Sequence, residues 1–169
     1  MAQRADSFDF AGLGLSSGEA GQLVLEVPVD ELSFGGQTYS AGGGAVARLD
    51  LSRTTSGYAL RLRFEVRLDG PCMRCLEDVR AGVLGDAREV DQPGDAEELR
   101  SPYVEGAVVD LRAWARDALA LALPTQIFCR DDCLGLCAIC GANLNADPEH
   151  VHEREPDPRW AKLSELKLE

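Results

Sequence analysis

The residues in this sequence best suited to chemistry are its six cysteines and two histidines. Four of the cysteines fall within twelve residues, two form a C-x-x-C pair far upstream, and both histidines follow the cluster closely. Thiolates and imidazoles bind zinc readily, and ligand pairs two to four residues apart are typical of tetrahedral zinc sites. The pattern therefore predicts two zinc ions held by eight side chains: Cys72, Cys75, Cys129, Cys133, Cys137, Cys140, His150 and His152.

The spacing also predicts how these ligands are shared. Cys137 and Cys140 precede Gly141, which leaves room for backbone N–H groups to reach the thiolates. In an extended segment, His150 and His152 face the same side, so both can reach one ion. These four side chains predict one site. The remaining two cysteine pairs would hold the second ion and join two distant parts of the chain.

Three other interpretations of the cysteines remain open. A single zinc could use two C-x-x-C pairs and leave two spare thiols: the pairs are Cys72 with Cys75 and Cys137 with Cys140, and the spare thiols are Cys129 and Cys133. A dithiol redox site would need its C-x-x-C at a helix N-terminus, which lowers a thiol pKa, whereas here the upstream pair follows a predicted strand. An iron–sulfur cluster also fits the spacing, although the histidines favour zinc.

The motifs favour a binding protein over an enzyme. A catalytic zinc keeps one open coordination position beside a general base, whereas the ligands here form closed sets. The sequence contains no H-E-x-x-H motif, and the glycine run at 42–44 lacks the lysine and the following helix of a phosphate-binding loop. We therefore expect no catalytic residues.

Composition and charge restrict the partners and the compartment. The net charge of −12, from 17 basic and 29 acidic residues, repels a phosphate backbone and disfavours general nucleic-acid binding. It suits solubility, or a partner with a basic surface such as a ribosomal or RNA-processing protein; ribosomal RNA is a weaker candidate. No run approaches the ~20 apolar residues of a membrane span, and the first ten residues lack the apolar core of a secretory signal. We expect a cytoplasmic protein, where thiols stay reduced.

The elements that must position the ligands are mostly strands. Apolar residues at every second position over 58–68 predict a long strand with one buried and one wet face. A turn at 55–57 predicts antiparallel pairing with a strand at 45–51, and a further strand is predicted at 22–27. The long strand leads into the first C-x-x-C, and alternation over 79–83 predicts a returning strand.

One helix is predicted over 111–123, with Asp110 as its N-cap, Pro124 at its end and an apolar side that covers the sheet. A short amphipathic helix is predicted at 157–168. The expected fold class is α+β: a mainly antiparallel sheet covered by one main helix, with a C-terminal zinc-binding knuckle module and a short terminal helix. The expected division is a flexible N-terminal arm at 1–21, a body at 22–128 that includes the first knuckle, and a cysteine-rich module at 129–169.

The wet face of the long strand carries Arg61, Arg63 and Arg67, and Arg74 follows within the first knuckle. Cross-strand pairing with carboxylates such as Asp50 is the simplest explanation for a basic patch on an acidic protein. Because they lie beside the first knuckle, the same four arginines are also our candidates for a contact with RNA or a partner.

Three segments together resemble the bacterial YceD family, called the large ribosomal RNA subunit accumulation protein. They are P-C-M-R-C-L-E at 71–77, A-L-P-T-Q-I-F-C-R-D-D-C-L-G-L-C-A-I-C-G-A-N-L-N at 122–145 and D-P-R-W-A-K-L at 157–163. The resemblance covers roughly 49–168. It implies a small cytoplasmic α+β protein of ribosome biogenesis that supports accumulation of large-subunit ribosomal RNA.

Members of the family with the full cysteine cluster carry a final ligand pair, often C-x-C, and His150 and His152 stand in that position here. The resemblance thus implies a non-catalytic zinc protein that acts through protein or RNA contacts. The alternative functions are a zinc-thiolate redox sensor and a regulator of an RNA-processing enzyme.

Overall fold

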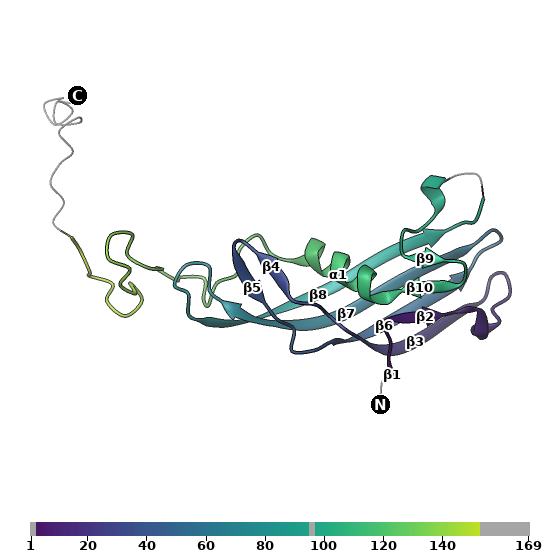
Figure 1. Ribbon diagram of the computed structural model, residues 1–169, viewed down its shortest axis with the longest axis horizontal. Helices are drawn as coiled ribbons and strands as arrows, with labels where there is room; N and C mark the ends of the chain where they lie inside the picture. Colours follow the sequence, from purple (N-terminus) through teal and green to yellow (C-terminus); the bar gives the residue numbers. More distant parts are fainter. Residues whose placement is uncertain (1–2, 95–96, 153–169) are drawn as a thin grey trace, which may run out of the picture.

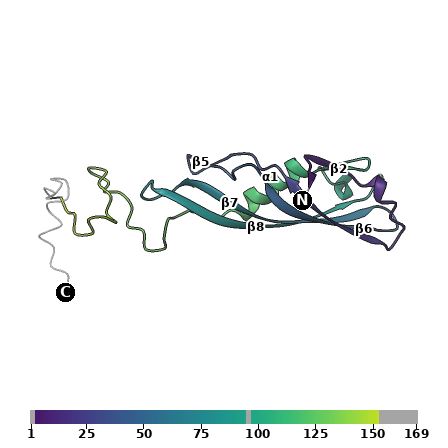
Figure 2. The same cartoon turned by 90° about the horizontal axis from the view of Figure 1, so that it is seen from below.

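The computed structural model describes residues 3–94 and 97–152 (Figures 1 and 2). Its largest described element is a five-stranded sheet in the order β1-β3-β6-β7-β8. The first pair is parallel and the other neighbours are antiparallel. The strands are β1 (Gln3–Arg4), β3 (Ala20–Val27), β6 (Ala45–Arg53), β7 (Tyr58–Pro71) and β8 (Asp78–Asp91).

The alternating pattern over 58–68 forms β7 as predicted. Its apolar side chains from Leu60 to Leu68 are buried in the core, while the intervening residues face away. The hairpin with β6 is also confirmed: Leu49 lies opposite Leu62, and the Thr54 amide donates to the Gly57 carbonyl at 2.9 Å. Strand β8 then returns antiparallel to β7 along its whole length.

The predicted helix is α1 (Leu111–Ala122), and Asp110 caps it by accepting a hydrogen bond from the Ala113 amide. Its buried side includes Leu111, Trp114 and Leu119, and the helix packs mainly against β8. Figure 2 shows α1 on one face of the large sheet, so the prediction of one covering helix is confirmed.

The N-terminal segment, for which we expect a flexible arm, contains short regular elements. A three-stranded sheet joins β2 (Ser7–Asp9), β10 (Val108–Asp110) and β9 (Val104–Glu105). The 3-10 turn η1 (Ala11–Leu13) follows β2, and η2 (Glu97–Leu99) precedes β9. Phe10 is buried with its ring 4.6 Å from that of Tyr58. The scattered apolar residues of this segment therefore pack onto the body.

The end of β7 is held by a small hairpin of β4 (Leu32–Phe34) and β5 (Gln37–Tyr39). The Tyr39 hydroxyl donates to the Pro71 carbonyl at 2.9 Å, directly before the first C-x-x-C. Figure 1 shows the segment that follows α1 running to this end of the sheet and continuing beyond it. The predicted helix at 157–168 lies outside the described residues. Within them, no helix is long and apolar enough to cross a membrane.

Two candidate metal centres

The first C-x-x-C forms a tight turn between β7 and β8. The Cys72 amide donates to the Glu77 carbonyl at 2.7 Å, and the Leu76 amide donates to the Cys72 carbonyl at 3.0 Å. The Arg74 amide points at the Cys72 sulfur, 3.4 Å away. These bonds curl the backbone around the first thiol, as expected for a knuckle that presents two sulfurs to one ion.

The second C-x-x-C repeats this turn bond for bond. The Cys137 amide donates to the Ala142 carbonyl and the Gly141 amide to the Cys137 carbonyl, both at 2.8 Å, and the Ile139 amide lies 3.5 Å from the Cys137 sulfur. The residue after the second cysteine has a positive φ in both turns, 74° at Gly141 and 62° at Leu76. Two stretches of unlike sequence thus form the same knuckle.

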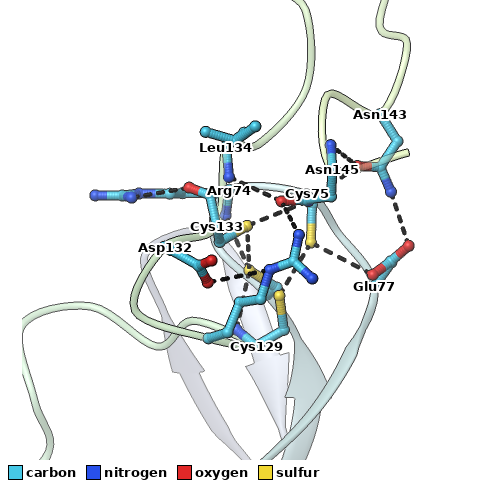
Figure 3. Close-up of polar contacts among 11 residues, drawn as sticks. Arg74, Cys75, Glu77, Cys129, Asp132, Cys133, Leu134, Asn143 and Asn145 are labelled. Carbon is cyan, nitrogen blue, oxygen red and sulfur yellow. Dashed lines mark hydrogen bonds and ion pairs between the residues drawn. The ribbon is translucent and has the colours of Figure 1, made fainter. Parts of the chain in front are cut away.

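Two more cysteines, Cys129 and Cys133, complete a cluster at the first knuckle (Figure 3). They lie on the segment that follows α1. The sulfurs of Cys72 and Cys133 are 3.9 Å apart, those of Cys75 and Cys129 are 3.6 Å apart, and all four lie within 4.8 Å of one another. Four thiolates around a tetrahedral zinc with Zn–S bonds of about 2.3 Å would be about 3.8 Å apart. The arrangement therefore fits a zinc ion and is far too open for a disulfide.

The surroundings of this first cluster hold its ligands in place. Cys72, Cys75 and Cys133 are buried. The Cys129 amide lies 3.3 Å from the Cys72 sulfur. The Arg74 guanidinium lies over the Phe128 ring at 4.0 Å and donates to the Cys133 carbonyl at 2.9 Å. Arg74 therefore links the knuckle to both ends of the arriving segment.

The second cluster joins Cys137 and Cys140 to His150 and His152, again with all four ligand atoms within 4.8 Å of one another. The Cys140 sulfur is 3.2 Å from each Nε2, and the two Nε2 atoms are 3.0 Å apart. Tetrahedral zinc would set these separations at about 3.5 Å and 3.3 Å, close to those present. The other ring nitrogen of His150, Nδ1, lies 3.7 Å from the Asp147 carboxylate.

The first cysteine of each knuckle has a lowered thiol pKa, which favours the thiolate form. Burial raises the pKa of Cys72, but hydrogen bonds led by backbone N–H groups outweigh it and bring the pKa down to about 6. The backbone N–H groups of Cys140 and Ile139 lower the pKa of Cys137, also to about 6. Because the thiolate is the form that binds metal, the same turn supplies the same electrostatic support twice.

The other thiols of the first cluster depend more on their neighbours. Burial raises the pKa of Cys75 to about 12 and also raises that of Cys129. Burial acts in the same direction on Cys133, but hydrogen bonds led by that from Asn145 lower its pKa. Four thiols held this close favour sharing their negative charge with a cation, and metal binding would release the protons of those still protonated.

Comparison with known proteins decides the family. Residues 60–167 match the family described as "Large ribosomal RNA subunit accumulation protein YceD", which is more than half of the chain. The chain belongs to the YceD family. The family is described by ribosomal RNA accumulation and not by a reaction.

Similar curated proteins occur in mycobacteria. Uncharacterized proteins of Mycobacterium tuberculosis (strain H37Rv) and Mycobacterium bovis are 41% identical to this YceD protein over 103 residues, which cover 57% of this chain and 49% of the relative. One from Mycobacterium leprae is 38% identical over 101 residues, covering 56% and 46%. The chain thus spans about half the length of the curated relatives it matches. No solved structure matches it.

Two asparagines of this YceD protein connect the clusters, and ligand spacing in the sequence does not point to them because neither is a metal ligand. The Asn145 side chain accepts from the Leu134 amide at 2.8 Å and lies 3.5 Å from the Cys133 sulfur. The Asn143 side chain donates to the Glu77 carboxylate at 2.7 Å (Figure 3). The sequence signal for these two residues is the N-L-N at 143–145. Two side-chain amides on one side of a turn can form hydrogen bonds with polar groups that no helix or strand satisfies.

The four predicted contact arginines do not form one site. Arg61 pairs with Asp86 and Arg63 with Asp50, so the expected cross-strand pairing is confirmed for these two. Arg67 lies on the same face of β7 as Arg61 and Arg63. Arg74 lies at the first cluster, over the Phe128 ring, and donates to the Cys133 carbonyl.

Proposed function

We propose that this chain is a non-catalytic zinc-binding factor that supports accumulation of large-subunit ribosomal RNA. One observation carries the proposal: eight cysteine and histidine side chains gather into two sets of tetrahedral size, the first of them from distant parts of the chain, in a family described by that role. The donor chemistry, thiolate and imidazole only, is that of zinc.

The proposed metal acts as a structural support. Each set supplies four protein ligands, which fill a tetrahedral zinc and leave no position for a substrate or for water. In the first set, a bound ion would tie the β7–β8 end of the sheet to the segment after α1. Such sites contribute folding free energy directly, on the order of 10 kcal/mol each. The ligands need reduced thiols, which supports a cytoplasmic location.

The proposed partner is a ribosomal or RNA-processing protein with a basic surface. The net charge of −12 favours such a partner over bare RNA. Direct RNA contact by the arginines of the sheet face is the secondary form of the proposal, because Arg61 and Arg63 are already neutralised by aspartates. Salt dependence of binding to purified ribosomal RNA separates the two: a steep loss with added salt would indicate phosphate contacts.

The test combines metal content with ribosomal RNA levels. Freshly purified, unoxidised protein should contain two zinc ions per chain. Deletion of the gene should lower large-subunit relative to small-subunit ribosomal RNA, and the wild-type gene should restore it. Cys72→Ser should fail to restore it, whereas Thr125→Ala, on the exposed loop before the first cluster, should succeed. Protein without zinc, or unchanged ribosomal RNA in the deletion strain, would contradict the proposal.

A second candidate function, zinc-thiolate redox sensing, is favoured by the exposure of the second cluster, where Cys140 is exposed and Cys137 half-buried. Hydrogen peroxide could oxidise this thiolate pair to a disulfide, with two waters formed and the zinc released. Zinc release at micromolar peroxide, with function lost in step, would favour this candidate. Zinc retention while ribosomal RNA levels still depend on the protein would exclude it.

A further inference from the structure

Strand β8 forms one edge of the large sheet and is open. It is the last strand in the sheet order and pairs with β7 alone. Within the described residues, no hydrogen bond from outside this pair reaches the backbone of 78–91. An open edge offers unpaired N–H and C=O groups to another strand, and proteins usually protect such edges with proline, charged side chains (lysine above all) or short length. Strand β8 has 14 residues and neither proline nor lysine, and its charged side chains are of both signs.

The side chains of β8 on the sheet face away from α1 carry a charge pattern that is its own complement. Asp78, Arg80, Asp86 and Arg88 alternate in sign, and between them stand Gly82 and Leu84. An antiparallel second copy presents these four residues in the opposite order, so each negative side chain can lie opposite a positive one. Leu84 is 73% exposed, and Gly82 has open space where a side chain would stand.

We propose that β8 pairs antiparallel with β8 of a second copy, about a twofold axis at Val83, to form one continuous sheet across a homodimer. In this register Asp78 faces Arg88 of the second copy. Arg80, which is paired within its chain with Asp69, faces Asp86 of the second copy, which is paired within its own chain with Arg61. By symmetry each of these ion pairs occurs twice. Leu84 faces Gly82 of the second copy, so the exposed leucine side chain fills the open space beside the glycine, which has no side chain.

The face of β8 toward α1 also accepts a strand. A groove of about 380 Å³ runs between this strand and α1, lined by Ala87, Trp114, Ala118 and Leu121, and Leu121 is 89% exposed. The proposed pairing brings the small apolar side chains of Val79 and Ala81 of the second copy alongside it. The groove lies along the second half of β8, from Leu84 to Glu89, so the two α1 helices would lie over opposite halves of the paired strands.

Charge selects this register over its neighbours. Moving the axis to Leu84 sets Arg80 against Arg88 of the second copy, and moving it to Gly82 sets Asp78 against Asp86. Like charges directly opposite one another destabilise strand pairs. An axis at Ala87 restores only the pairing of Arg88 with Asp86 and brings the two α1 helices together. The four charges of the edge sum to zero, and repulsion between the acidic remainders is screened beyond about 8 Å at physiological salt.

The test is the oligomeric state of the full zinc-loaded chain, measured by sedimentation velocity over a micromolar concentration series. The wild type should dimerise. Asp78→Arg and Arg88→Asp should each weaken dimerisation by about tenfold, and the double variant, which exchanges the charges, should restore it. Leu84→Lys should also weaken it. Arg48→Asp, on the central strand β6 and on the same face, is the matched control and should leave it unchanged.

Circular dichroism and zinc content verify that each variant is folded. A chain that stays monomeric throughout the series overturns the proposal, as do single reversals with no effect or a double variant that fails to recover. A reversal at Asp78 that leaves the dimer intact overturns this register, since an axis at Ala87 does not use that residue. Amides of β8 that gain hydrogen-exchange protection only when a different protein is added would assign the edge to that partner instead.

Discussion

The two candidate metal centres share one backbone turn and differ in almost everything around it. The first is mostly buried and draws its ligands from two segments, one before β8 and one after α1, whereas the second is partly exposed and lies within the sixteen residues 137–152. A link between distant segments removes more conformational freedom from the unfolded chain than a local one. The comparison shows that the same knuckle can stabilise a whole fold or only a local module, depending on what it joins.

The largest predicted difference between the centres concerns loss of a ligand. Cys72→Ser should lower the free energy of unfolding of the body by about 4 kcal/mol or more, because the buried site would lose its ion and its link. Cys140→Ser should change it by less than about 0.5 kcal/mol. Urea unfolding followed by Trp114, which is buried in the body, measures both. Equal losses of unfolding free energy in the two variants would contradict the idea that the first centre stabilises the whole body and the second only its own module.

Chelation should separate the centres in time. With excess chelator, the ion of the second centre should leave on the order of 100-fold faster, because release from the buried centre needs local opening that costs about 3 kcal/mol. A colorimetric zinc indicator should then record two phases of equal amplitude. The Cys140→Ser variant serves as the control and should lose the fast phase alone. A single phase in the wild type would show that burial does not govern release.

Arg74 should sharpen the comparison, because only the first knuckle has such a side chain. Arg74→Ala removes the contact with the Phe128 ring and the bond to the Cys133 carbonyl, and should destabilise the body by about 2 kcal/mol. Arg116→Ala, which removes an exposed arginine of α1 that is paired with Asp117, should cost at most about 0.5 kcal/mol. Thermal unfolding of the zinc-loaded proteins gives both values, and similar losses would contradict the role of Arg74.

The smallest predicted effect exchanges the residues that end the knuckles. Leu76 adopts a left-handed conformation in which a side chain is strained, and this leucine is 53% exposed, so it gains little from packing. Leu76→Gly should therefore stabilise the body by about 1 kcal/mol, and Gly141→Leu should destabilise the second module by a similar amount. Denaturant unfolding checks the first change, and zinc affinity at the second centre checks the other. A destabilising Leu76→Gly would show that this side chain makes a contact that stabilises the fold.

The local elements were largely predictable. Alternation over 58–68 predicted β7 and its buried face, and Asp110 and Pro124 bounded α1, because each of these signals acts over a few neighbouring residues. The structure gathers the eight cysteine and histidine side chains into the two sets that the spacing suggested. That these sets bind zinc stays a prediction. The packing of Phe10 and the bridging asparagines went unpredicted, since each depends on a partner far along the chain.

The sequence alone determined the four longest strands, the helix and both knuckles, because alternation, capping and a six-residue hydrogen-bonded turn are short-range effects. Only the tertiary structure decided which knuckle is buried, which arginine supports it, and which strand is left at the edge of the sheet. The physical reason is that burial and strand order follow from how distant segments pack together. A residue's immediate neighbours carry no record of that packing.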